Sequence, residues 1–63
     1  MIDQTTIDKL NMLHDTLQPF IDEVARKRQA ASSDKYLWSY VSKKIDLAGK
    51  AIGMALDKIE ENN

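Results

Sequence analysis

The sequence contains no cysteine, and among its 63 residues there are only one histidine, one proline and two glycines. Without cysteine there is neither a disulfide nor a thiolate metal site, and one histidine is too few for a histidine-rich metal site. The shortage of proline and glycine leaves little room for loops. A chain this short buries little surface and is marginal as a monomer, so we expect oligomerisation or a partner chain to stabilise it.

Long apolar runs are also missing. The longest stretch without a charge after Lys50 covers residues 51–56, and the first four residues already include Asp3, so we expect no membrane span and no signal peptide. The absence of cysteine fits a cytoplasmic protein. Charged residues make up 30% of the chain and apolar residues 43%, a soluble balance, and the net charge of −1 argues against general nucleic-acid affinity.

Motifs for catalysis are absent as well. His14 is the only candidate general base at neutral pH, and it lies between Ile7 and Ile21 on the edge of an apolar stripe, a position typical of packing. There is no glycine-rich phosphate loop, no dinucleotide fingerprint and no metal-binding motif. We therefore expect no enzymatic activity, no cofactor and no metal.

Apolar residues recur every three or four positions, which predicts two helices and no strands. The first helix is expected over about 4–31. Its apolar face is predicted as a heptad seam, flanked by Ile7, His14 and Ile21. We assign the residues of this seam to the core or the dimer interface: Leu10, Leu13, Leu17, Phe20 and Val24. Pro19 lies on the polar side of this face. We favour a bend there over a break with a restart at Thr16, because the stripe keeps its phase across the proline.

The only turn signal covers residues 30–34, at the midpoint of the chain. It predicts a turn at about 32–33, with Ser32 or Ser33 capping a second helix over about 34–60. So short a turn makes the two helices antiparallel neighbours. The predicted fold is therefore all-α: a single hairpin domain over residues 1–63 that pairs with a second copy into a dimeric four-helix bundle.

The second helix carries a core seam of residues spaced by sevens, namely Trp38, Ile45, Ile52 and Ile59. A complementary seam is formed by Val41, Ala48 and Ala55. Gly49 and Gly53 lie beside these seams. Because glycine inside a helix costs about 1 kcal/mol relative to alanine, we expect another helix to approach closely at these two positions.

A second apolar stripe, well away from the core seam, is formed by Tyr36, Tyr40, Leu47 and Met54. One neighbouring helix cannot cover both sides of the second helix. The stripe is therefore expected to pack against the other subunit of a homodimer or to bind a partner protein. Tyrosine is common at interface hot spots and methionine adapts its shape, so we assign these four residues as the candidate partner-binding site.

Charge is segregated along the hairpin. Residues 24–44 have a net charge of +5, whereas residues 1–23 carry −4 and residues 45–63 carry −2. The cations of the turn end, which we call the basic tip, are Arg26, Lys27, Arg28, Lys35, Lys43 and Lys44. Each tip is expected either to lie over the acidic end of the other subunit or to meet an acidic partner or the phosphates of RNA.

Residues 45–56 resemble the second helix of small phage-encoded quorum-sensing anti-activators, mainly at Ala48, Ala51, Gly53, Ala55 and Leu56. Those proteins are helical hairpins that dimerise and inhibit host proteins by contact, so the resemblance implies an inhibitor of a host regulatory protein. We predict a non-enzymatic protein-binding regulator or inhibitor. The alternatives share only the hairpin outline: a co-chaperone subunit of a secretion system that holds a partner helix, and a dimeric RNA-binding regulator.

Overall fold

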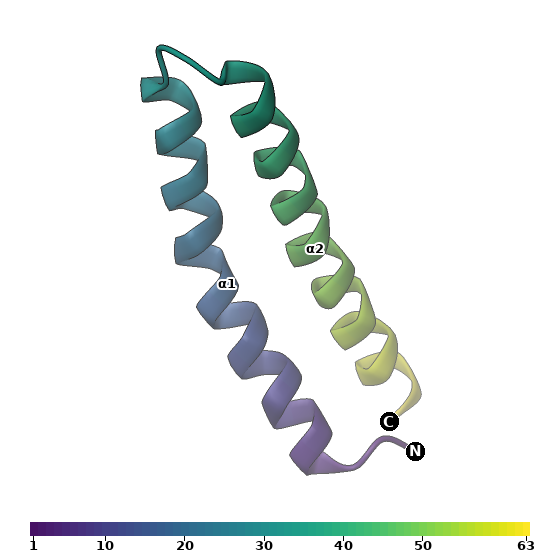
Figure 1. Cartoon of the computed structure of the whole chain (residues 1–63). Helices are drawn as coiled ribbons and strands as arrows, with labels where there is room; N and C mark the ends of the chain where they lie inside the picture. The colour runs from purple at the N-terminus through teal and green to yellow at the C-terminus, as the bar shows by residue number, and fades with distance from the viewer.

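The computed structural model describes residues 1–63 and consists of two antiparallel helices packed side by side (Figure 1). Helix α1 spans Gln4–Ala30 and helix α2 spans Lys35–Asn62. The molecule measures 47 × 15 × 11 Å, and both termini lie at the end opposite the turn. The predicted all-α fold with two packed helices is confirmed. Each helix is covered on one side only, by the other helix.

Helix α1 begins at a side-chain cap. The Asp3 carboxylate accepts hydrogen bonds from the Thr6 hydroxyl at 2.8 Å and from the Thr6 backbone N–H at 3.2 Å. These two donors, the hydroxyl first, lower the pKa of Asp3 from its ordinary value of 3.8 because they stabilise the charged carboxylate. The helix then continues through Pro19 without interruption, so the alternative of a break and a restart at Thr16 is excluded.

The cap of α2 differs from the predicted serine cap. Its N-cap is Asp34, which has a left-handed backbone (φ 57°, ψ 28°) and makes no side-chain capping hydrogen bond. The Asp34 carbonyl accepts the first helical hydrogen bond, from the Trp38 N–H at 3.0 Å. The reason is geometric: the chain must reverse within residues 31–34, and a left-handed residue produces such a reversal. Aspartate is among the few residues other than glycine that tolerate it.

The contact between the helices is narrow. Only Val24, with 3% of its surface exposed, and Gly49 are buried. The half-buried apolar residues between the helices are Ile7, Leu10, Leu17 and Ile21 of α1 and Trp38, Val41, Ile45, Ile52, Leu56 and Ile59 of α2. The hairpin therefore has a seam of partly covered side chains and almost no enclosed core.

Both glycines face α1, and the close approach expected from the sequence is found at Gly49. A β-carbon on Gly49 would lie 2.7 Å from Cδ1 of Ile21, which is closer than atoms pack, and 3.8 Å from Cδ2 of Leu17. A β-carbon on Gly53 would lie 3.5 Å from Nε2 of His14, an ordinary contact. The absence of a side chain at Gly49 is thus what lets Ile21 reach the surface of α2.

The face of α1 that contacts α2 differs from the face predicted from the sequence. The predicted seam included Leu13 and Phe20, but their side chains are exposed, at 52% and 47%. The residues expected only at the flank, Ile7, His14 and Ile21, are half-buried instead. The physical reason is the groove at Gly49 and Gly53, which accepts this side of α1 and leaves the opposite edge outside.

The left-handed backbone of Asp34 gives a first test. We expect Asp34→Val to lower the free energy of unfolding by about 1–2 kcal/mol, because a β-branched residue is strained there. Asp34→Gly is expected to be neutral or stabilising. Both variants remove the same charge, so the difference between them reports the backbone. Urea unfolding followed by circular dichroism at one fixed protein concentration measures it, and equal stabilities would contradict the assigned turn.

The two glycines give a second, internally controlled test. Gly53→Ala is expected to raise the free energy of unfolding by roughly 0.5–1 kcal/mol, because alanine favours the helix and its β-carbon fits. Gly49→Ala has the same gain in helix propensity, but its β-carbon must displace Cδ1 of Ile21, so we expect a smaller gain in stability than for Gly53→Ala. The same urea titration compares them, and an equal gain at both positions would rule out the close contact.

Candidate interaction surface

The residues assigned as partner-binding form a continuous stripe on the outside of α2. Tyr36, Tyr40, Leu47 and Met54 are exposed by 85%, 54%, 55% and 71%. Their spacing of four, seven and seven residues places them on one face of a helix. Since Trp38 and Ile45 pack toward α1, this stripe points away from the hairpin contact. We call these four residues the back stripe.

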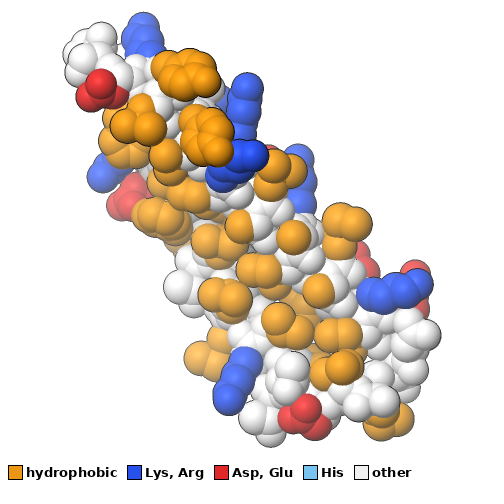
Figure 2. Space-filling model, turned by 45° about the vertical axis from the view of Figure 1, so that its right-hand side comes forward, with side chains coloured by type: hydrophobic (Ala, Val, Ile, Leu, Met, Phe, Trp, Pro, Cys, Tyr) orange, Lys and Arg blue, Asp and Glu red, His pale blue; other side chains and the backbone are white.

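A second apolar surface lies along one side of the hairpin. Because Gly49 and Gly53 face His14 and Ile21, the opposite edges of both helices lie together on the other side. Figure 2 shows hydrophobic side chains following the whole length of the molecule there and over the outside of α2. The residues of this side, which we call the alanine face, are Leu13 and Phe20 of α1 and Leu37, Ala48 and Ala55 of α2, and the half-buried Val41 lies where this face meets the seam.

The side of the hairpin that carries the glycines is polar. His14, Gln18, Asp46 and Lys50 surround a shallow hollow of about 180 Å³ over Gly49. Lys50 pairs with Asp46 at 3.2 Å, and the amide nitrogen of Gln18 lies 3.5 Å from Nε2 of His14. No three metal-ligating side chains cluster anywhere in the chain. The hollow is open, and its polar groups contact one another.

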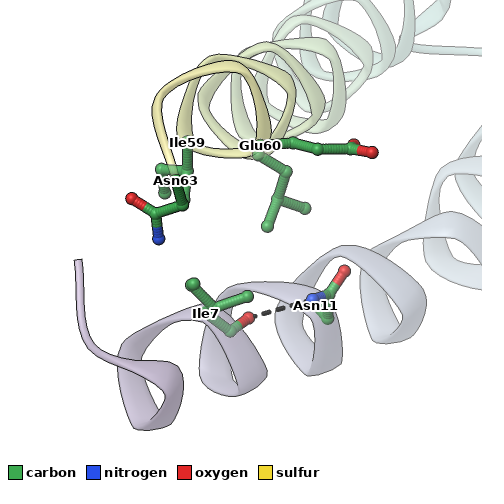
Figure 3. Close-up of a pocket in the computed structure, with 6 residues that line it drawn as sticks. Ile7, Asn11, Ile59, Glu60 and Asn63 are labelled. Carbon is green, nitrogen blue, oxygen red and sulfur yellow. Dashed lines mark hydrogen bonds between the residues drawn. The ribbon is translucent and has the colours of Figure 1, made fainter. Parts of the chain in front are cut away.

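A further hollow of about 250 Å³ lies at the terminal end, between Ile7 and Asn11 of α1 and Ile59 of α2 (Figure 3). The Asn11 amide donates a hydrogen bond to the Ile7 carbonyl at 3.1 Å. Glu60 extends away from Ile7 in this view. Such a shallow, partly apolar dent suits the packing of a side chain from another molecule better than the enclosure of a small ligand.

The basic tip is not neutralised within the chain. The ion pairs of the structure join Lys50 to Asp46 and Lys58 to Glu61, and neither includes a tip cation. Two tip lysines instead lie over aromatic rings: Lys27 is 5.9 Å from the Trp38 ring centre and Lys44 is 5.3 Å from that of Tyr40. The tip therefore presents unpaired positive charge, some of it stacked on aromatic surface.

Comparison with known proteins adds no assignment. No protein-family model matches the chain, and no significant match was found among the curated proteins or the solved structures. The resemblance of residues 45–56 to anti-activators stays a prediction. Neither helix has the long apolar stretch that crossing a membrane requires.

The structure brings the predicted stripe residues together on one face but divides the predicted core residues. Leu10, Leu17, Val24 and the Trp38–Ile59 seam lie between the helices, whereas Leu13 and Phe20 lie on the alanine face. Sequence reasoning missed Leu37, which is 60% exposed. It precedes Val41 by one helical turn, so extending the line of Val41, Ala48 and Ala55 toward the turn would have found it.

Proposed function

We propose that this chain is a non-enzymatic regulator or inhibitor that acts in the cytoplasm by direct contact with a protein, as a homodimer of two hairpins in a four-helix bundle. The observation that carries the proposal is the back stripe, Tyr36, Tyr40, Leu47 and Met54, exposed on the outside of α2. Exposed apolar surface of this length on a small chain is typical of a protein interaction site.

The chemistry of the stripe favours a helical partner. Its two tyrosines offer large, rigid contact area with a polar tip, and Met54 adapts to the shape that it meets. A straight row of residues along one helix suits the apolar face of another amphipathic helix. Lys43 and Lys44 flank the stripe near the turn and have no carboxylate partner. The fitting partner is therefore an amphipathic helix with acidic residues beside its apolar face.

The resemblance of residues 45–56 to anti-activators makes a regulatory protein of a phage host the first partner class to test. A co-chaperone that holds a partner helix would use the same stripe, and it differs in needing that partner to stay soluble. RNA binding rests on the unpaired cations of the basic tip. It is disfavoured because Trp38, the largest aromatic near the tip, is half-buried and covered by Lys27.

The test replaces the centre of the back stripe with charge. The double variant Tyr40→Glu/Leu47→Glu is expected to weaken partner binding about a hundredfold or more, because it removes two central contacts and desolvates two carboxylates. Partners are captured with the tagged chain from host cells, purified, and titrated by calorimetry. Circular dichroism checks that the variant remains helical.

The matched control is Gln4→Glu/Gln29→Glu, which adds the same charge at exposed polar positions of α1 away from the alanine face. This control is expected to bind the partner as the natural chain does. If the stripe variant also binds with unchanged affinity, partner recognition does not use the back stripe and the proposal fails. If RNA is captured instead, and its binding falls steeply with salt and is lost in Arg26→Ala/Lys35→Ala, the chain is an RNA-binding regulator.

A further inference from the structure

The alanine face is apolar surface that the back stripe does not account for. Leu13, Phe20 and Leu37 are exposed there by 52%, 47% and 60%. Ala48 and Ala55 continue the row on α2 with side chains small enough for another helix to approach closely. The hairpin buries a single apolar side chain, Val24, so this face is where the missing core has to be completed.

From this face and the charge distribution we infer that a second copy of this chain covers the alanine face in inverted orientation, with each basic tip beside the other copy's termini. This rests on the proposed homodimer and names its interface. A face 47 Å long and 15 Å wide offers on the order of 700 Å², close to the roughly 800 Å² per partner that stable interfaces bury.

Charge selects the inverted orientation over the parallel one. Residues 24–44 carry +5, whereas residues 1–23 and 45–63 together carry −6. A twofold axis along the hairpin would place two basic tips side by side, and an axis across it places each tip beside an acidic end. The tip cations have no carboxylate partner in their own chain. The second copy supplies the opposite charge at both ends, whereas Lys43 and Lys44, which flank the back stripe, stay free for the proposed partner.

The side chains of α1 fit the same symmetry. Leu13 and Phe20 lie on either side of Leu17, the middle residue of α1, so an axis crossing there brings Leu13 of one copy onto Phe20 of the other. Lys9 and Glu23 lie on the same edge, seven residues before and after Thr16, and the axis brings them near each other as well. Neither of these two has an ion-pair partner within its own chain.

The inverted arrangement also divides α2 between two interfaces. Ala48 is at the middle of α2, so the two copies of α2 cross at Ala48, where small side chains allow close packing. Leu47, the residue before Ala48, belongs to the back stripe and stays exposed in this dimer. The dimer thus leaves Tyr36, Tyr40, Leu47 and Met54 available for the proposed helical partner.

Two adjacent residues test the face. Light scattering on a size-exclusion column is expected to give twice the chain mass of 7.2 kDa for the natural chain and for Leu47→Glu, and a loss of dimer for Ala48→Glu. A monomeric natural chain overturns the inference. It is also overturned if Ala48→Glu remains dimeric, or if Leu47→Glu dissociates as Ala48→Glu does, because the dimer would then use the back stripe.

A distance measurement tests the orientation without disturbing the face. The chain has no cysteine, so Ser33→Cys accepts a single spin label at the exposed turn. In the inverted dimer the two labels lie at opposite ends, separated by a distance on the order of the 47 Å length, and pulsed dipolar spectroscopy reads it. Labels within about half that distance would mean a parallel dimer and overturn the inference. Loss of partner binding in Tyr40→Glu/Leu47→Glu with the dimer intact bears on the stripe alone.

Discussion

The contact of Ile21 with Gly49 governs the rest of this structure. A β-carbon on Gly49 would lie 2.7 Å from Cδ1 of Ile21, so any other residue at this position would force the end of the Ile21 side chain to move. The contact sets the rotation of both helices about their own axes. Once that rotation is set, Leu13 and Phe20 are directed to one side, and the tyrosines of α2 are directed outward. The Ile21–Gly49 contact and the packing of Val24 and Leu17 in the seam together determine which residues are exposed.

The hairpin leaves much of its apolar surface exposed. Two helices can cover only one side of each other, and here they bury a single apolar side chain, Val24. Ordering a chain has a large entropic cost that burial must offset. A seam of half-covered residues offsets this cost weakly. In the proposed homodimer, the exposed apolar residues of the alanine face supply the further burial.

The sequence was sufficient for the helices, the position of the turn and the close approach at the glycines, because each depends on local pattern or on a costly residue type. It was insufficient for the contact face of α1. Around the axis of α1, the apolar residues extend from the side of Ile7 to the side of Leu13, which is wider than one neighbouring helix covers. The periodicity therefore permits α1 to pack against α2 in more than one rotation about its own axis. The N-cap predicted for α2 was also wrong. Reversal of the chain over residues 31–34 places Asp34 at the N-cap with a left-handed backbone, in place of the predicted Ser32 or Ser33.

The back stripe could be found from the sequence alone, since a helix with apolar residues on two sides must use both. The structure adds that α2 has apolar residues on three sides: the seam with α1, the alanine face and the back stripe. A contact regulator needs its recognition surface free while it is assembled, and a helix with only two apolar sides could not meet both needs. Pairing of the basic tip with a second copy would also weaken its attraction for phosphates in general. Selectivity would then depend on the apolar stripe, where shape and side-chain fit discriminate better than charge.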